Sequence, residues 1–260
     1  MKSNQFIIIC LLLFTVQTAI AQNARFATQG VIEYEKRVNM YALIKKQITP
    51  RNESYMKPML ENYQKTQPQF KSLKSTLTFS KDQTLFKPIE NKDEINNTMW
   101  GDDFGASTQN NTVFTNTEAG TSISQKKVYE EIYLVKDSTR KINWKITNEI
   151  RNIAGYDCRR ANALIMDSIY VVAFYTDQIP VSGGPESFTG LPGMILGVAL
   201  PYEHVTWFAT SVLDQPVTDD KLKAPIKGKP VDNKQLITTL KAALKDWGEY
   251  AQDALKAFLL

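Results

Sequence analysis

Residues 190–196, Gly-Leu-Pro-Gly-Met-Ile-Leu, restrict the possible folds of this chain more than any other stretch. Two glycines and a proline within seven residues exclude a helix interior and an ordinary strand. Pro192 fixes its own φ and moves Leu191 towards extended conformations, whereas Gly190 and Gly193 can adopt positive φ. The preceding residues 179–188 are also rich in turn formers. We therefore predict a backbone corner, from which the apolar residues Met194 and Ile195 return to the core.

Several segments alternate between apolar and polar residues, which is typical of half-buried strands in an antiparallel sheet. Residues 168–175 differ because they are apolar on both faces, and they predict a central strand that is covered on both sides. The alternating sets are Leu73, Leu77 and Phe79, then Val128, Ile132 and Leu134 within residues 124–135, and Ile142, Trp144, Ile146 and Ile150.

The end of the sequence predicts an amphipathic helix over residues 232–260. Its apolar residues recur every three to four positions behind Asp232 and Asn233, which are favourable N-cap residues, and Gly248 is a weak point. Residues 216–231 contain three prolines and many charges and predict a linker. We expect an α+β, β-dominated fold. Residues 22–215 form a curved, mostly antiparallel sheet, and the C-terminal helix packs on the same domain.

The first residues have the three parts of a secretory signal peptide. A lysine precedes an unbroken apolar run over residues 6–14, and Ala19-Ile20-Ala21 provides small residues before a cleavage site. We predict that residues 1–21 are removed and that the protein is exported to the periplasm, the outer-membrane periphery or the medium. The later apolar segments are too short to span a membrane. Cys158 is the one cysteine left after cleavage, which excludes a disulfide framework.

The charge distribution argues against nucleic-acid binding. The formal net charge is +4, and the lysines and arginines are spread along the chain with acids between them. No basic tract of the kind that binds phosphate backbones is present in the sequence.

The sequence resembles the GLPGLI family of exported Bacteroidetes proteins. The structural motif that carries the family name is Gly190, Leu191, Pro192, Gly193, Met194 and Ile195, with Met194 in place of a leucine. The resemblance spans about residues 30–213 and includes residues 30–35, 144–146, 153–161, 173–180, 184–185, 188–193, 201–204 and 206–209.

This resemblance implies a fold similar to the open half-barrels of periplasmic lipoprotein carriers, although fold alone does not establish function. It also implies an accessory role in the cell envelope, linked to TonB-dependent outer-membrane transport. The family has no assigned activity, so the resemblance brings no catalytic residue and no cofactor.

Cys158 and His204 are the candidate metal ligands. His204 is the only histidine in the chain, which excludes zinc motifs that need two histidines and leaves a site of Cys158, His204 and two carboxylates. The alternative is a locally hydrogen-bonded histidine and a buried thiol, which the alternation around Cys158 favours. Met56 and Met59 resemble thioether copper ligands, but methionines more often fill gaps in a core.

A hydrolase with two acids is the last-ranked interpretation. Adjacent acids occur at Asp102–Asp103 and at Glu130–Glu131, but neighbours on a strand point to opposite faces. Six aromatic residues on predicted strands instead suggest an apolar binding face, unless the C-terminal helix fills that space. They are Tyr129, Tyr133, Tyr170, Phe174, Trp207 and Phe208.

The sequence thus favours a non-enzymatic envelope protein that binds a lipid, a peptide or an outer-membrane transport protein. The alternative is a metal-handling or metal-dependent protein centred on Cys158 and His204.

Overall fold

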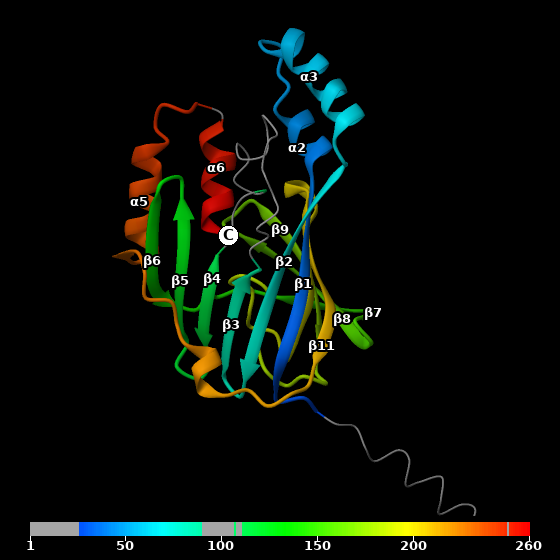
Figure 1. Ribbon diagram of the computed structural model, residues 1–260, viewed down its shortest axis with the longest axis vertical. Coiled ribbons are helices and arrows are strands. Elements are labelled where there is room, and N and C mark those ends of the chain that lie inside the picture. The colour runs from blue at the N-terminus through cyan, green and yellow to red at the C-terminus, as the bar shows by residue number, and fades with distance from the viewer. Residues whose placement is uncertain (1–25, 90–106, 108–110, 249) are drawn as a thin grey trace, which may run out of the picture.

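The structure is a computed structural model that describes residues 26–89, 107, 111–248 and 250–260. The predicted signal peptide and the pair Asp102–Asp103 lie outside the described residues. One large curved sheet dominates the molecule, with two helices beside one half and two more projecting beyond its end (Figure 1). This confirms the predicted β-dominated fold with a mostly antiparallel curved sheet.

Within the described part of the chain, twelve strands form the sheet in the order β12-β6-β5-β4-β3-β2-β1-β11-β10-β9-β8-β7. The pairing is antiparallel throughout, except between β12 and β6. The strands are β1 (Gln29–Asn39), β2 (Phe70–Ser80), β3 (Gln83–Pro88), β4 (Thr112–Asn116), β5 (Thr121–Val128), β6 (Glu131–Ser138), β7 (Lys145–Ile153), β8 (Tyr156–Ile165), β9 (Ile169–Thr176), β10 (Met194–Leu200), β11 (Val205–Leu213) and β12 (Lys229–Val231).

The helices connect or follow these strands. The helices are α2 (Met40–Lys46) and α3 (Glu53–Thr66) between β1 and β2, the short η1 (Pro201–Glu203) and η2 (Asp219–Leu222), and α5 (Asn233–Ala243) and α6 (Tyr250–Leu259). Asp232 begins α5 with a capping box, because its side chain accepts from the Gln235 amide and the Gln235 side chain accepts from the Asp232 amide.

Strand β1 shows how the alternation defines the faces of the sheet. Ile32, Tyr34, Lys36 and Val38 are buried on one side, which we call the inner face, whereas the residues between them are more exposed. Strand β9 is buried along both faces, as predicted for a central strand. Its neighbour β10 is buried in the same way.

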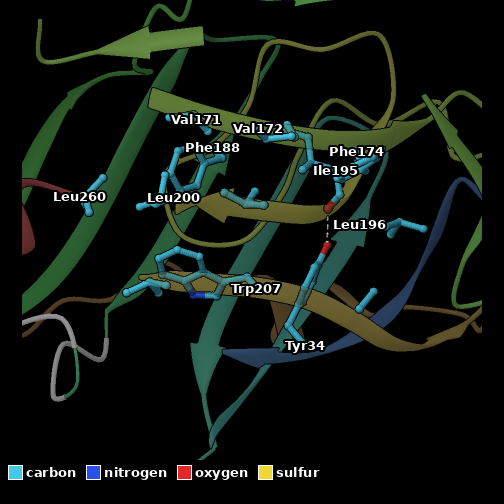
Figure 2. Packing of buried hydrophobic residues seen from close by; sticks show 14 of the residues in the cluster. Tyr34, Val171, Val172, Phe174, Phe188, Ile195, Leu196, Leu200, Trp207 and Leu260 are labelled. Carbon is cyan, nitrogen blue, oxygen red and sulfur yellow. Dashed lines mark hydrogen bonds between the residues drawn. The ribbon is translucent and has the colours of Figure 1, made fainter. Parts of the chain in front are cut away.

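The loop between β9 and β10, residues 177–193, crosses the inner face. It brings Phe188 against Trp207 of β11, with ring centroids 6.1 Å apart (Figure 2). Beside this contact, the hydroxyl of Tyr34 donates a 2.6 Å hydrogen bond to the carbonyl oxygen of Ile195 (Figure 2). The main core therefore lies between the sheet and this loop.

The loop ends in the predicted corner. Gly190 and Gly193 have φ of 94° and 143°. A Cβ atom on Gly193 would lie 2.1 Å from the carbonyl oxygen of Thr176, so this position requires glycine. Leu191, Met194 and Ile195 are buried, and Pro192 is exposed.

The C-terminal part differs from the sequence prediction in two ways. The helix expected over residues 232–260 is divided into α5 and α6, because Gly248 adopts a positive φ of 58° between them. The segment expected as a linker contains η2 and β12, because residues 229–231 pair with the edge of β6. Gly228 permits this approach, since a Cβ there would lie 2.8 Å from the Tyr133 carbonyl carbon.

Two predicted strands also differ. Residues 124–135 are divided between β5 and β6, because Tyr129 adopts a left-handed φ of 54° in the turn that joins them. In β7, Ile146 and Ile150 are exposed rather than half-buried. Their shared face is lost because β7 has a bulge between these two residues and is the last strand of the sheet.

Candidate functional site

Three charged side chains are buried on the inner face of the sheet. Lys36 lies on β1, Lys126 on β5 and Glu186 in the loop between β9 and β10, and each is 5% exposed. A buried charge costs several kcal/mol unless other groups compensate it, so charged residues are rarely retained in a core without a reason. We call these three residues the charged cluster.

Glu186 is held in place by its backbone and by an amide side chain. It has a left-handed φ of 53°, which is unusual for a residue with a side chain. The buried Asn111 donates a 2.8 Å hydrogen bond from Nδ2 to Oε2 of Glu186. Burial raises the pKa of the Glu186 carboxyl, while the charges of Lys36 and Lys126 and the Asn111 hydrogen bond act in the opposite direction.

Lys36 lies opposite Trp207 in the register of β1 and β11. Its Nζ is 5.2 Å from the centroid of the Trp207 ring, which is the geometry of a cation–π interaction. Burial lowers the pKa of Lys36 to about 8, although the nearby Glu186 carboxylate acts to raise it. Lys36 therefore has a proton that it can lose at mildly alkaline pH.

Lys126 connects the charged cluster to helix α6. Its Nζ donates a buried 3.1 Å hydrogen bond to the carbonyl oxygen of Phe258. Burial lowers the pKa of Lys126 to about 8, against the effect of Glu186. The neighbouring cations Arg140 and Lys36 lower it further.

The last carbonyl groups of α6 and that of Leu260, which follows it, are bound by side chains from three separate segments. Lys126 binds Phe258, Arg140 donates to the carbonyl oxygen of Leu259, and Ser187 donates a 3.0 Å hydrogen bond to that of Leu260. Carbonyl groups at the C-terminus of a helix have no intrahelical partners and carry partial negative charge. The positive side chains therefore compensate this end of α6.

Apolar contacts and partly exposed ion pairs hold the rest of α6. Phe258 packs in a small cluster with residues of β5, β6 and α5, and Leu260 joins the main core. Lys46 of α2 pairs with Asp253 at 3.2 Å and with Glu203 at 3.6 Å, and Lys256 pairs with Glu203 at 3.6 Å. Partly exposed pairs of this kind contribute about 0.2–1 kcal/mol each, so they fasten α6 only weakly.

A small cavity of about 40 Å³ lies between α6, α5 and the sheet. A cavity of this size holds about one or two water molecules. Its lining is rich in hydrogen-bonding groups and consists of Ser122, Ser124, Lys126, Val135, Asp137, Ser138, Arg140, Ser187, Asn233, Leu236 and Leu259.

Two further polar atoms are buried on the strands beside Lys36. The hydroxyl oxygen of Ser75 and the indole nitrogen of Trp207 have no hydrogen-bond partner among the described residues. Orphaned buried donors are uncommon in native proteins and often mark a group that binds water or a ligand. Hydrogen-bonding groups without a partner among the described residues therefore lie on both strands that flank Lys36.

The six aromatic residues predicted as one binding face lie in four separate places. Trp207 belongs to the core of the inner face, whereas its neighbour Phe208 points the opposite way and packs against Phe174 at 6.3 Å. Tyr133 is buried beneath α5 and α6, and Tyr129 contacts Phe258 at the rim of this region. Tyr170 is half-buried and faces Tyr202 in a fourth place.

The structure does not bring Cys158 and His204 together. Strand register places His204, which follows β10, near the level of Ala163, five residues along β8 from Cys158. Five residues of strand correspond to about 16 Å. Cys158 is fully buried, and burial raises its thiol pKa to about 12, so the thiolate that binds metals is disfavoured.

The remaining candidates for metal binding and for acid catalysis do not form a site among the described residues. No group of three or more His, Cys, Asp or Glu side chains among the described residues has a metal-binding arrangement. Met56 is buried in the core, and Met40 lies there as well. Glu130 lies in the exposed turn between β5 and β6, and Glu131 is exposed at the start of β6.

Sequence reasoning missed the charged cluster. The signal for Lys36 is present, because this lysine falls within the series Ile32, Tyr34, Lys36 and Val38, which otherwise faces the core. Lys126 has a weaker signal between Ser124 and Val128. Glu186 has none, since it lies in a loop whose path over the sheet the local sequence does not reveal.

Comparisons with known proteins support the fold and leave the activity open. A family model described as a protein of unknown function (Porph_ging) matches residues 164–197, which include β9 and the corner. No curated protein matches the sequence. Among the described residues, no helix is long and apolar enough to cross a membrane.

Two solved structures of PNGF-II have a similar fold. The structure in the C2 space group has a TM-score of 0.50 and 16% identity over 80% of this chain, and the one in the P21 space group has 0.50 and 18% over 82%. The match covers 31% and 33% of PNGF-II, so this chain spans about a third of that protein. At this level of identity, the similarity concerns the fold alone.

Proposed function

We propose that this chain is an exported binding protein of the cell envelope, of the GLPGLI type. Its binding face is the inner face of β5 and β6, which helix α6 covers until a ligand replaces the helix. The observation that carries this proposal is the charged cluster, whose Lys126 binds the last turn of α6. A core that served only stability would have no need for two lysines and a glutamate in these positions.

The attachment of α6 supports the same role. Its apolar side chains cover the inner face of β5 and β6, while weak ion pairs to Lys46 and Glu203 hold its outer side. Gly248 lies at its N-terminal end and adopts a positive φ. A helix attached in this way can open locally at a smaller cost than the central strands can.

The proposal is tested with a neutral apolar probe, N-phenyl-1-naphthylamine, whose fluorescence rises in apolar surroundings. Lys46→Ala removes the ion pairs with Asp253 and Glu203, so we expect probe affinity to rise roughly threefold relative to the wild type. The matched control is Lys57→Ala, which breaks the exposed pair with Glu53 within α3. Absence of probe binding to both the wild type and Lys46→Ala would contradict the proposal.

Export and the link to outer-membrane transport are separate parts of the proposal. They rest on the sequence of residues 1–21 and on the resemblance to the GLPGLI family. When the full chain is expressed with its own leader in a Bacteroidetes host, we expect a mature N-terminus at Gln22 outside the cytoplasm. Recovery of the uncleaved chain from the cytoplasm alone would refute export.

A further inference from the structure

Helix α6 shows what kind of molecule its binding face accepts. It presents apolar side chains to the sheet and to α5, and it directs the partial negative charge of its last carbonyl groups at Lys126 and Arg140. In physical terms, α6 is an apolar stem with a negative end. A ligand that replaces α6 must therefore make apolar contacts with the sheet and α5, and it must offer acceptor groups to Lys126 and Arg140.

The loss of α6 removes hydrogen-bond acceptors from two cations. Lys126 donates to the carbonyl oxygen of Phe258 and Arg140 donates to that of Leu259, while among the described residues Glu186 is the acid whose charge acts on Lys126. Asp137 also lines the cavity, but its oxygens accept hydrogen bonds from the amides of Ser138 at 2.7 Å and Asn233 at 3.0 Å. Because Lys126 and Arg140 each lose the carbonyl acceptor that α6 provides, an anion would be favoured in its place.

Some neutral groups near the site also have donor capacity to spare. Ser187 donates to the carbonyl oxygen of Leu260, so its hydroxyl is released when α6 leaves, whereas the hydroxyls of Ser122 and Ser138 already donate to the Phe114 carbonyl oxygen and to Asp137. The orphaned Ser75 hydroxyl and Trp207 indole flank Lys36. An indole N–H can only donate, and a hydroxyl can donate to any acceptor that approaches it. An oxyanion offers several acceptor oxygens to Lys126, Arg140 and these donors, whereas an ammonium group would offer none to the two cations or to the indole N–H.

We infer that the ligand that replaces α6 is an anionic amphiphile, whose oxyanion head is held by Lys126 and Arg140. Its apolar tail lies on the inner face that Phe258 and its neighbours now cover. This inference rests on the proposed function. The head group is a carboxylate or a phosphate monoester, since both present the acceptor oxygens that the site lacks.

The test is displacement of N-phenyl-1-naphthylamine by four competitors: dodecyl phosphate, dodecanoate, dodecanol and inorganic phosphate. The first three share one tail length and differ in the head, and the last is a head without a tail. We expect the two anionic amphiphiles to compete at least tenfold more tightly than dodecanol. Inorganic phosphate should not displace the probe.

Two variants locate the head group. Lys126→Met should reduce the advantage of dodecyl phosphate over dodecanol at least fivefold. The matched control, Lys127→Met, changes the adjacent exposed lysine on the other face of β5 and should keep that advantage. Because Lys126→Met leaves Glu186 less compensated, Lys126→Met with Glu186→Gln is measured alongside it, and thermal unfolding confirms that each variant is folded.

The outcomes separate this inference from the proposed function. Equal competition by dodecanol and dodecyl phosphate, or an unchanged preference in Lys126→Met, would overturn the anionic head and leave the binding protein intact. Displacement by inorganic phosphate as strong as that by dodecyl phosphate would replace the amphiphile with a free anion. If the probe itself does not bind, the proposed function fails first.

Discussion

The inner face of the sheet has an apolar half and a polar half, and they are covered in different ways. Around β9 and β10, the side chains on both faces are apolar and the backbone pairs on both sides. Around β4 and β5, the buried inner residues include Thr115, Ser124 and Lys126, and the cover is a helix held by side-chain hydrogen bonds and ion pairs. We therefore expect the apolar half to provide most of the folding stability, and we expect local opening to occur at α6 in the polar half.

The largest expected effect concerns the apolar half. Ile195 is fully buried beside the corner, so Ile195→Ala should lower the free energy of unfolding by about 3 kcal/mol through lost burial and a cavity. Ile150 of β7 is 65% exposed, and Ile150→Ala should cost less than about 0.5 kcal/mol. Urea unfolding of both variants measures the contrast. If both variants lost similar amounts of unfolding free energy, the proposed concentration of stability in the apolar half would be contradicted.

The next effect is a pH dependence in the polar half. Lys126 has a pKa of about 8 in the folded protein and an ordinary value of 10.5 when unfolded, so the folded state binds fewer protons between these values. Stability therefore rises with pH in this window. The free energy of unfolding of the wild type, relative to that of Lys126→Met, should rise by about 1 kcal/mol between about pH 8 and pH 9.

Urea unfolding at a series of pH values gives this difference directly. Tyr34, Lys36 and Cys158 titrate in both proteins, so their contributions largely cancel in the comparison. A difference that stays constant with pH would show that Lys126 is solvated in the folded protein and that the polar half is not a buried site.

The smallest effect concerns the ion pairs of α6. Glu203→Gln removes the pairs with Lys46 and Lys256 and should lower the stability of the docked helix by about 0.5–1 kcal/mol. Hydrogen exchange should become faster in α6 and stay unchanged in β10. Glu53→Gln on α3 is the control, because its ion pair is local to that helix. Faster exchange in both elements would mean that α6 unfolds only with the whole domain.

The sequence predicts the apolar half better than the polar half, for a physical reason. Strand β9 and the corner follow from local chemistry, because alternation and the special φ of glycine act over a few residues. The charged cluster depends on three distant segments. Lys126 and Glu186 meet only because the loop after β9 crosses the inner face, and no local pattern encodes that crossing.

Helix α6 illustrates the same limit. Its amphipathic pattern predicts a packed helix, and Gly248 marks the break before it. The pattern does not reveal which strands the helix covers, or that its last carbonyl groups meet Lys126, Arg140 and Ser187. The six aromatic residues failed to form one face for a related reason: adjacent residues such as Trp207 and Phe208 point to opposite sides of a strand.

The most direct test of the account is hydrogen exchange of the wild-type protein with and without saturating dodecyl phosphate. If the ligand replaces α6, the amides of residues 250–259 should exchange at least tenfold faster in the complex, while those of β10 keep their protection. Binding of dodecyl phosphate with unchanged or increased protection of α6 would contradict the central claim that this helix occupies the binding face.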